Sequence, residues 1–141
     1  MTELRDGHLY LDQPINLLYV EDTPDDAALF MAHIKRLDKN RAINVIHYAN
    51  GIDAAAHIAI EPIDMAILDV EVPGLTGYQI NSVLRAFPHG RNVPVRYGTN
   101  LDDCAELPRD RRSTTLTIPF SKDELRRNLG SIIYDALKDA A

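Results

Sequence analysis

The feature that most limits the fold of this chain is an alternation of two apolar periods. Short apolar runs rich in β-forming residues recur at 15–20, 43–48, 64–69, 93–97 and 114–118. Between most of them, apolar residues recur at intervals of three and four, which is the spacing of one face of a helix. Strands that alternate with helices pair in parallel, and the crossover helices cover both faces of the sheet. The sequence therefore predicts an α/β fold with a doubly wound, five-stranded parallel sheet.

Local signals mark where several of the predicted helices begin. Thr23 suits a helix cap and Pro24 suits the first helical position. Ser121 and Glu124 have the spacing of a capping box before the last helix. The segment 101–112 has weak periodicity and predicts one short helix at most.

Bulk properties limit the class of protein. A length of 141 residues suits one compact domain, which we divide into an N-terminal extension at 1–14 and a domain at 15–141. A net charge of −6 argues against nucleic acid as the main partner. The N-terminus lacks the apolar core of a signal peptide, and no uncharged apolar run approaches the roughly 18 residues of a membrane span. The lone Cys104 fits a reducing compartment, so we expect a cytoplasmic protein without a membrane partner.

Carboxylates follow two of the predicted strands where each strand ends. Glu21 and Asp22 come after the first strand, and Asp69 ends the third. Because sites in open parallel sheets form at the carboxyl ends of strands, we expect these acids to converge. Oxygen ligands around such a site suit Mg²⁺, and Thr99 would add a hydroxyl from the fourth strand. The alternative is that each acid only caps a neighbouring helix.

These residues resemble the receiver domain of two-component response regulators. The matching pieces are Glu21-Asp22, the run from Asp69 to Gly77, Pro94-Val95 leading to Thr99, and Pro119-Phe120. The resemblance covers about residues 15–138 and implies a flavodoxin-like sheet with the strand order 2-1-3-4-5.

The resemblance also implies a chemistry for the site. Asp69 would be the phosphoacceptor, which takes a phosphoryl group from a histidine kinase or a histidine phosphotransfer protein. Mg²⁺ would be held by Asp22, Asp69 and the backbone carbonyl of Glu71, with Glu21 orienting metal-bound water. Thr99 would hydrogen-bond a phosphoryl oxygen. Without a DNA-binding domain, the chain would then signal to a downstream protein, and a homodimer is compatible with this role.

Several positions depart from the family pattern. The family has Lys before the proline that follows the fifth strand, and this chain has Ile118. The family's switch aromatic corresponds to Thr115, and Asn100 replaces a small residue. The segment from Thr99 to Ile118 is short, which predicts a short or missing fourth helix. The family's cis peptide predicts a cis Ile118–Pro119 bond.

The missing lysine has an electrostatic consequence. With no cation beside them, the clustered carboxylates should repel one another, and we expect raised pKa values in the metal-free protein. Lys122 could replace the lysine, but its place at the start of a helix suggests that it points to solvent. Arg96, Arg111 and Arg112 are weaker candidates.

Two functions remain open from the sequence. The leading hypothesis is a stand-alone receiver that accepts a phosphoryl group on Asp69 and is not an enzyme. The alternative is a degenerate receiver that binds proteins without phosphorylation, which the Ile118 and Thr115 changes favour. A phosphatase of the haloacid-dehalogenase type fits poorly, because it needs a further Asp and Lys and a longer chain.

Overall fold

The computed structural model describes residues 1–100, 110–112, 115–117 and 119–140. Its strands are β1 (Glu3–Arg5), β2 (His8–Tyr10), β3 (Ile15–Val20), β4 (Ile43–Tyr48), β5 (Met65–Asp69), β6 (Val95–Thr99), β7 (Asp110–Arg112), β8 (Thr115–Thr117) and β9 (Phe120–Ser121). Its helices are α1 (Pro24–Leu37), α2 (Gly51–Ile60), α3 (Gly77–Ala86), α4 (Lys122–Arg127) and α5 (Leu129–Ala140), with a 3-10 turn at Pro88–Gly90.

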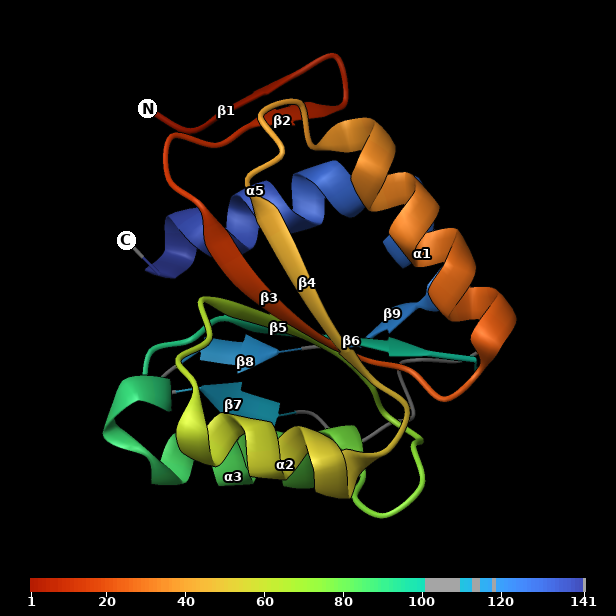
Figure 1. Cartoon of the computed structure of the whole chain (residues 1–141), viewed down its shortest axis with the longest axis vertical. Coiled ribbons are helices and arrows are strands. Elements are labelled where there is room, and N and C mark those ends of the chain that lie inside the picture. Colours follow the sequence, from red (N-terminus) through yellow and green to blue (C-terminus); the bar gives the residue numbers. More distant parts are fainter. Residues whose placement is uncertain (101–109, 113–114, 118, 141) are drawn as a thin grey trace.

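A five-stranded parallel sheet forms the centre of the molecule (Figure 1). Its strands lie in the order β4-β3-β5-β6-β9, and every neighbouring pair is parallel. Numbered along the chain within this sheet, that order is 2-1-3-4-5, so the predicted fold class and strand order are confirmed. All five carboxyl ends therefore lie along one edge of the sheet.

One layer of helices covers each face of the sheet, and the sheet separates two hydrophobic cores. On one face, α1 and the C-terminal helices pack over β3 and β5, with Phe30, Leu129 and Ile133 buried. On the other face, α2 and α3 enclose a second core around Leu18, Ile58 and Ile80. Every residue of β5 is buried, as expected for a central parallel strand covered on both sides.

The first residues form a small antiparallel hairpin of β1 and β2 that packs beside α5 and α1. Leu9 is fully buried and joins the core beneath α1. The backbone N–H of Lys39 donates to the carbonyl of Leu9 at 3.0 Å, which ties the hairpin to the end of α1. The division of the chain at residue 14 stays a prediction.

The fifth strand differs from the prediction. We placed it at 114–118, but Thr115–Thr117 pairs with β7 in a local antiparallel hairpin. The last strand of the central sheet is β9, where Phe120 and Ser121 pair with Gly98 and Thr99. The alternating residues before Pro119 do form a strand, but it pairs with β7 and not with the central sheet.

Two further expectations concern the same region. The segment predicted to hold a short or missing fourth helix includes 101–109, which lies outside the described residues, and the described part of it forms β7. The Ile118–Pro119 bond, predicted to be cis, also lies outside the description because Ile118 does. The last helix is divided into α4 and α5 at Asn128, whose N–H donates to the carbonyl of Glu124 at 3.0 Å.

Among the described residues, no helix has the length and apolar character needed to cross a bilayer.

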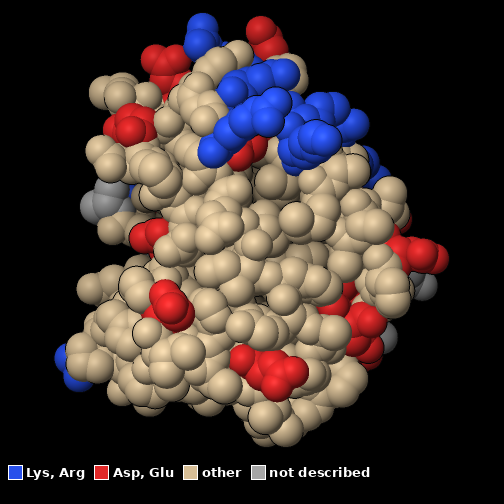
Figure 2. All heavy atoms as spheres, viewed as in Figure 1, with Lys and Arg blue, Asp and Glu red and all other residues tan. Residues whose placement is uncertain are grey.

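Lys and Arg side chains gather at the top of the face shown in Figure 2, toward the end of α1. The segment that ends α1 and follows it carries Lys35, Arg36, Lys39 and Arg41, all exposed.

Candidate functional site

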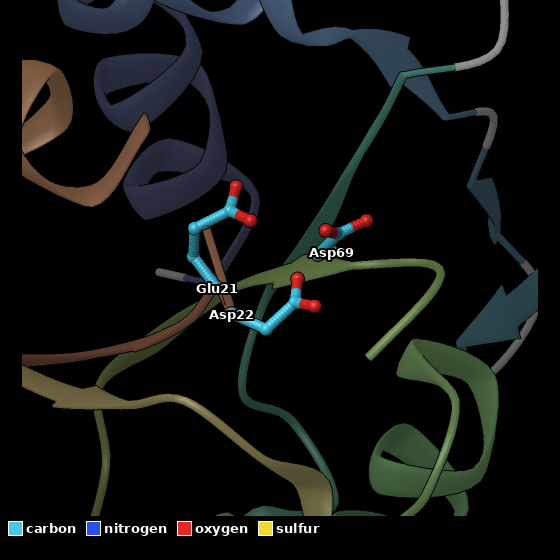
Figure 3. Close-up of side chains that lie close together, drawn as sticks. All are labelled: Glu21, Asp22 and Asp69. Carbon is cyan, nitrogen blue, oxygen red and sulfur yellow. The ribbon is translucent and has the colours of Figure 1, made fainter. Parts of the chain in front are cut away.

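Three carboxylates converge at the carboxyl edge of the sheet (Figure 3). Glu21, Asp22 and Asp69 each offer an oxygen, and these oxygens all lie within 4.8 Å of one another. Glu21 and Asp69 are buried, with 3% and 6% of their surface exposed, and Asp22 is exposed. The expected convergence of these acids is therefore present in the structure.

The sheet itself brings these acids together. β3 and β5 are parallel neighbours in which Val20 lies opposite Leu68, so the residues that follow reach the same edge. The backbone N–H of Glu71 donates to Asp69 Oδ1 at 3.1 Å, which orients the carboxylate.

The backbone at the start of α3 lies close against the end of β5. A Cβ atom on Gly77 would lie 2.6 Å from the carbonyl oxygen of Asp69, closer than real Cβ contacts. The Gly77 N–H also donates to the carbonyl of Val70 at 3.0 Å. Glycine is therefore required where α3 begins, because a side chain would push the helix away from the loop after β5.

Lys122 is the site residue that the sequence analysis misplaced. Its ammonium lies 2.8 Å from Glu21 Oε1, 3.1 Å from Asp69 Oδ2 and 3.2 Å from Asp26 Oδ2. The residue is only 6% exposed, so the expectation that it points to solvent was wrong.

The shifted fifth strand explains this position. Lys122 directly follows β9, so it leaves the end of the fifth strand as the family's lysine does, although its place in the sequence comes after the proline. Ile118, the position where the sequence lacks the lysine, lies outside the described residues.

The charges of the site are therefore compensated, contrary to our expectation. Burial raises the pKa of Glu21 above its ordinary value, the hydrogen bond from Lys122 opposes this rise, and the charge of Asp69 adds to it. Burial alone would lower the pKa of Lys122, but its hydrogen bond to Glu21 and the charge of Asp69 outweigh burial and raise it. Lys122 is thus held charged within the acidic group.

A second set of charges surrounds this centre. Asp26, on the first turn of α1, also accepts from Arg126 Nη1 at 3.4 Å. Arg126 Nη2 lies 2.6 Å from Asp123. Tyr19 lies beneath these acids, and its pKa is raised by burial and then by the charges of Glu21, Asp26 and Asp69. The site is a network of alternating charges between α1 and α4.

The remaining predicted positions have different surroundings. Thr99 ends β6, beside the strand of Asp69, and is 1% exposed, whereas Asn100 is exposed. Arg96 does not reach the site, because its Nη2 lies 2.9 Å from Asp139. Thr115, in β8, does not belong to the central sheet. The side chains of Thr115, Arg111 and Arg112 lie outside the description.

The donor set suits a hard divalent cation. Its three side-chain ligands are all carboxylates, and carboxylate oxygens are what Mg²⁺ prefers in proteins. Within the described part of the chain, this is the one group of metal-ligating side chains of this kind, and it contains no His or Cys. The residues therefore fit Mg²⁺.

Comparison with curated proteins shows similarity to parts of longer bacterial proteins. No family model matches the chain. It is 29% identical over 122 residues to the regulatory protein LuxO of Vibrio cholerae, which covers 84% of this chain and 26% of that protein. The chain spans less than a third of the length of the curated relatives it matches.

Solved structures are similar over most of the chain. A receiver domain of a sensor histidine kinase from Pseudomonas aeruginosa, with a magnesium ion in its active-site cleft, is 26% identical with a TM-score of 0.63, covering 89% of this chain and 98% of that one. The signal receiver domain of a histidine kinase from Syntrophus aciditrophicus is 23% identical with a TM-score of 0.67, covering 88% and 90%. With its sheet order and its acidic edge, the chain has the fold of a receiver domain and resembles the receiver domains of these signalling proteins.

Proposed function

We propose that this receiver accepts a phosphoryl group on Asp69 in a Mg²⁺-dependent reaction and signals through contact with other proteins. The observation that carries the proposal is the position of Asp69 at the end of β5, where it lies between two further carboxylates and the ammonium of Lys122. The donor would be a histidine kinase or a histidine phosphotransfer protein. The lone Cys104 fits the reducing cytoplasm, where we place this exchange.

The transfer is a nucleophilic substitution at phosphorus. An oxygen of Asp69 forms the new P–O bond, and the P–N bond to the donor histidine breaks. The bonding electrons return to the imidazole nitrogen, and the ring leaves neutral because its other nitrogen carries a proton. Asp69 becomes an acyl phosphate, so in this role the chain is a phosphoacceptor and not an enzyme.

Several groups would lower the charge repulsion in this step. Asp22, Asp69 and the carbonyl of Glu71 would hold Mg²⁺, with Glu21 orienting its water. The bound ion would neutralise charge on the transferring group. Lys122 already contacts Asp69 at 3.1 Å and would supply a second positive charge.

Thr99 would donate a hydrogen bond to a phosphoryl oxygen. This role is supported by its position one residue beyond Gly98, which lies opposite Asp69 in the neighbouring strand. The altered position at Asn100 is exposed beside it and would contact a partner instead of the phosphoryl group.

The alternative of a phosphorylation-independent binding module rested mainly on the missing lysine. Lys122 supplies the missing positive charge from the end of β9, and that weakens the reason for preferring the alternative. The changed switch position, Thr115, remains the feature in its favour.

The proposal is tested by incubating the protein with Mg²⁺ and a small acyl phosphate and measuring its intact mass. We expect the mass of one phosphoryl group to be gained by the wild type and not by Asp69→Asn or by wild type with excess chelator. Asp25→Asn is the matched control, because it removes an exposed carboxylate that forms no ion pair among the described residues. Equal gains in wild type and Asp69→Asn would place the phosphate elsewhere and contradict the proposal.

A further inference from the structure

One carboxylate outside the predicted metal site contacts both cations of α4. Asp26 Oδ2 lies 3.2 Å from Lys122 Nζ, and Asp26 Oδ1 lies 3.4 Å from Arg126 Nη1. Asp26 is on the first turn of α1, and the two cations lie four residues apart on one side of α4. This single side chain therefore joins the two helices beside the acidic cluster.

The ammonium of Lys122 is shared among three carboxylates. A lysine ammonium has three protons to donate and no acceptor. Three carboxylates lie within ion-pair distance of Lys122 Nζ, those of Glu21, Asp26 and Asp69. Each of the three protons therefore has one carboxylate to meet, and Asp26 fixes the direction of one of them.

The backbone position of Lys122 limits how far its ammonium can move. Lys122 is the first residue of α4, and Ser121 caps that helix by accepting from the N–H of Glu124 at 3.1 Å. The lysine side chain therefore extends from a fixed helix end, and its ammonium can be shifted between carboxylates only within a small range. A fixed acid on α1 can set that position.

We propose that Asp26 is a positioning residue that anchors the ammonium of Lys122 from the α1 side of the site and offsets part of its positive charge. The inference rests on the proposed function, because it concerns the same site. Asp26 does not belong to the group of oxygens that suits the metal. It acts on the site through Lys122.

Loss of the Asp26 charge would weaken Mg²⁺ binding for two reasons of the same sign. One negative charge near the ion disappears, and the ammonium, already in contact with Glu21 and Asp69, loses the carboxylate that offsets part of its repulsion of the ion. With an effective dielectric typical of a protein surface, we expect Asp26→Asn to raise the Mg²⁺ dissociation constant about fivefold or more. Asp25→Asn removes the same charge from an exposed neighbour, and we expect a change below about twofold.

The experiment is a calorimetric Mg²⁺ titration of wild type, Asp26→Asn, Asp26→Glu and Asp25→Asn. Asp26→Glu keeps the charge and should restore most of the affinity. Repeating the Asp26→Asn substitution in a Lys122→Met background should give a smaller loss, because the lysine through which Asp26 acts is gone. Equal losses for Asp26→Asn and Asp25→Asn, or an undiminished loss without Lys122, would overturn the proposal.

A second measurement separates this inference from the proposed function. Urea unfolding of the four combinations of Asp26→Asn and Lys122→Met, without metal, gives the coupling between the two residues. We expect the two substitutions to be coupled by about fivefold or more in the unfolding equilibrium constant. If wild type binds no Mg²⁺, the metal-dependent function fails, and the coupling alone decides the proposal, with its absence overturning it. If Lys122→Met does not fold, the comparison of the three Asp26 and Asp25 variants with wild type still decides it.

Discussion

Replacement of Lys122 by Met should strongly destabilise the metal-free protein. The substitution keeps most of the aliphatic stem but removes the charge that contacts three carboxylates at 2.8, 3.1 and 3.2 Å. Two of these partners, Glu21 and Asp69, are buried and would keep no cation within ion-pair distance among the described residues.

The size of the effect follows from the burial of Lys122 together with Glu21 and Asp69. At an effective dielectric of about 20, each contact near 3 Å contributes about 5 kcal/mol of attraction, which the desolvation of the ions largely offsets. Removal of one partner of a buried pair typically costs about 3–5 kcal/mol because the other charge stays buried. We therefore expect Lys122→Met to lower the free energy of unfolding at pH 7 by about 3 kcal/mol, and the melting temperature by about 10 °C.

The pH dependence gives this prediction a second signature. The folded pKa of Glu21 is raised, so its protonated form favours folding below the ordinary value of 4.5, and that contribution is lost as pH rises through the folded value. Without Lys122, the pKa of Glu21 should rise further. The cost of Lys122→Met should therefore be smallest near pH 4 and grow toward pH 7.

Urea unfolding followed by circular dichroism would measure these effects. Lys39→Met is the control, because it removes the same charge from an exposed position. The reasoning is refuted if Lys122→Met costs no more than Lys39→Met at pH 7, or if its cost does not change between pH 4 and pH 7.

Two further substitutions and one metal titration test other parts of the structure. Gly77→Ala should cost about 1–3 kcal/mol and impair phosphorylation, because its Cβ would meet the Asp69 carbonyl at 2.6 Å; wild-type stability by urea unfolding would contradict this contact. Leu9→Ala should cost about 2–5 kcal/mol, since Leu9 is fully buried in the core beneath α1; a cost below about 1 kcal/mol would show that the hairpin is not part of the folded unit. The raised pKa of Glu21 should fall when Mg²⁺ is added, as measured by carboxyl NMR titration, and an unchanged value would argue against metal binding beside Glu21.

The sequence was sufficient for the sheet and for the acidic half of the site. The parallel sheet follows from the alternation of periods, right-handed crossovers leave few arrangements, and the resemblance to receiver domains implied the strand order. The convergence of Glu21, Asp22 and Asp69 follows in turn, since all three lie at the carboxyl ends of neighbouring strands.

The position of Lys122 was missed because the fifth strand was placed too early. The run before Pro119 has the alternation of a strand, and nothing local shows that its partner is β7 and not β6. A signal was present in the helix itself, because Lys122, Leu125 and Leu129 have the spacing of one buried helical face. A lysine in the apolar register of a helix indicates a buried acidic partner.

The N-terminal hairpin could not be predicted for a different reason. Its strands have three residues each, and their outward positions are charged or polar. Such short strands give little periodicity, and the burial of Leu9 depends on α1, which follows it in the chain.

The central claim, that Asp69 accepts a phosphoryl group beside Lys122, is tested most directly by a crystal structure with Mg²⁺ and beryllium fluoride, a mimic of a phosphoryl group. We predict beryllium fluoride on an Asp69 oxygen, Mg²⁺ about 2.0–2.1 Å from oxygens of Asp22, Asp69 and the Glu71 carbonyl, and Lys122 Nζ bound to a fluorine. An unmodified Asp69 with Mg²⁺ absent, or Lys122 turned to solvent while Asp69 is modified, would contradict the account.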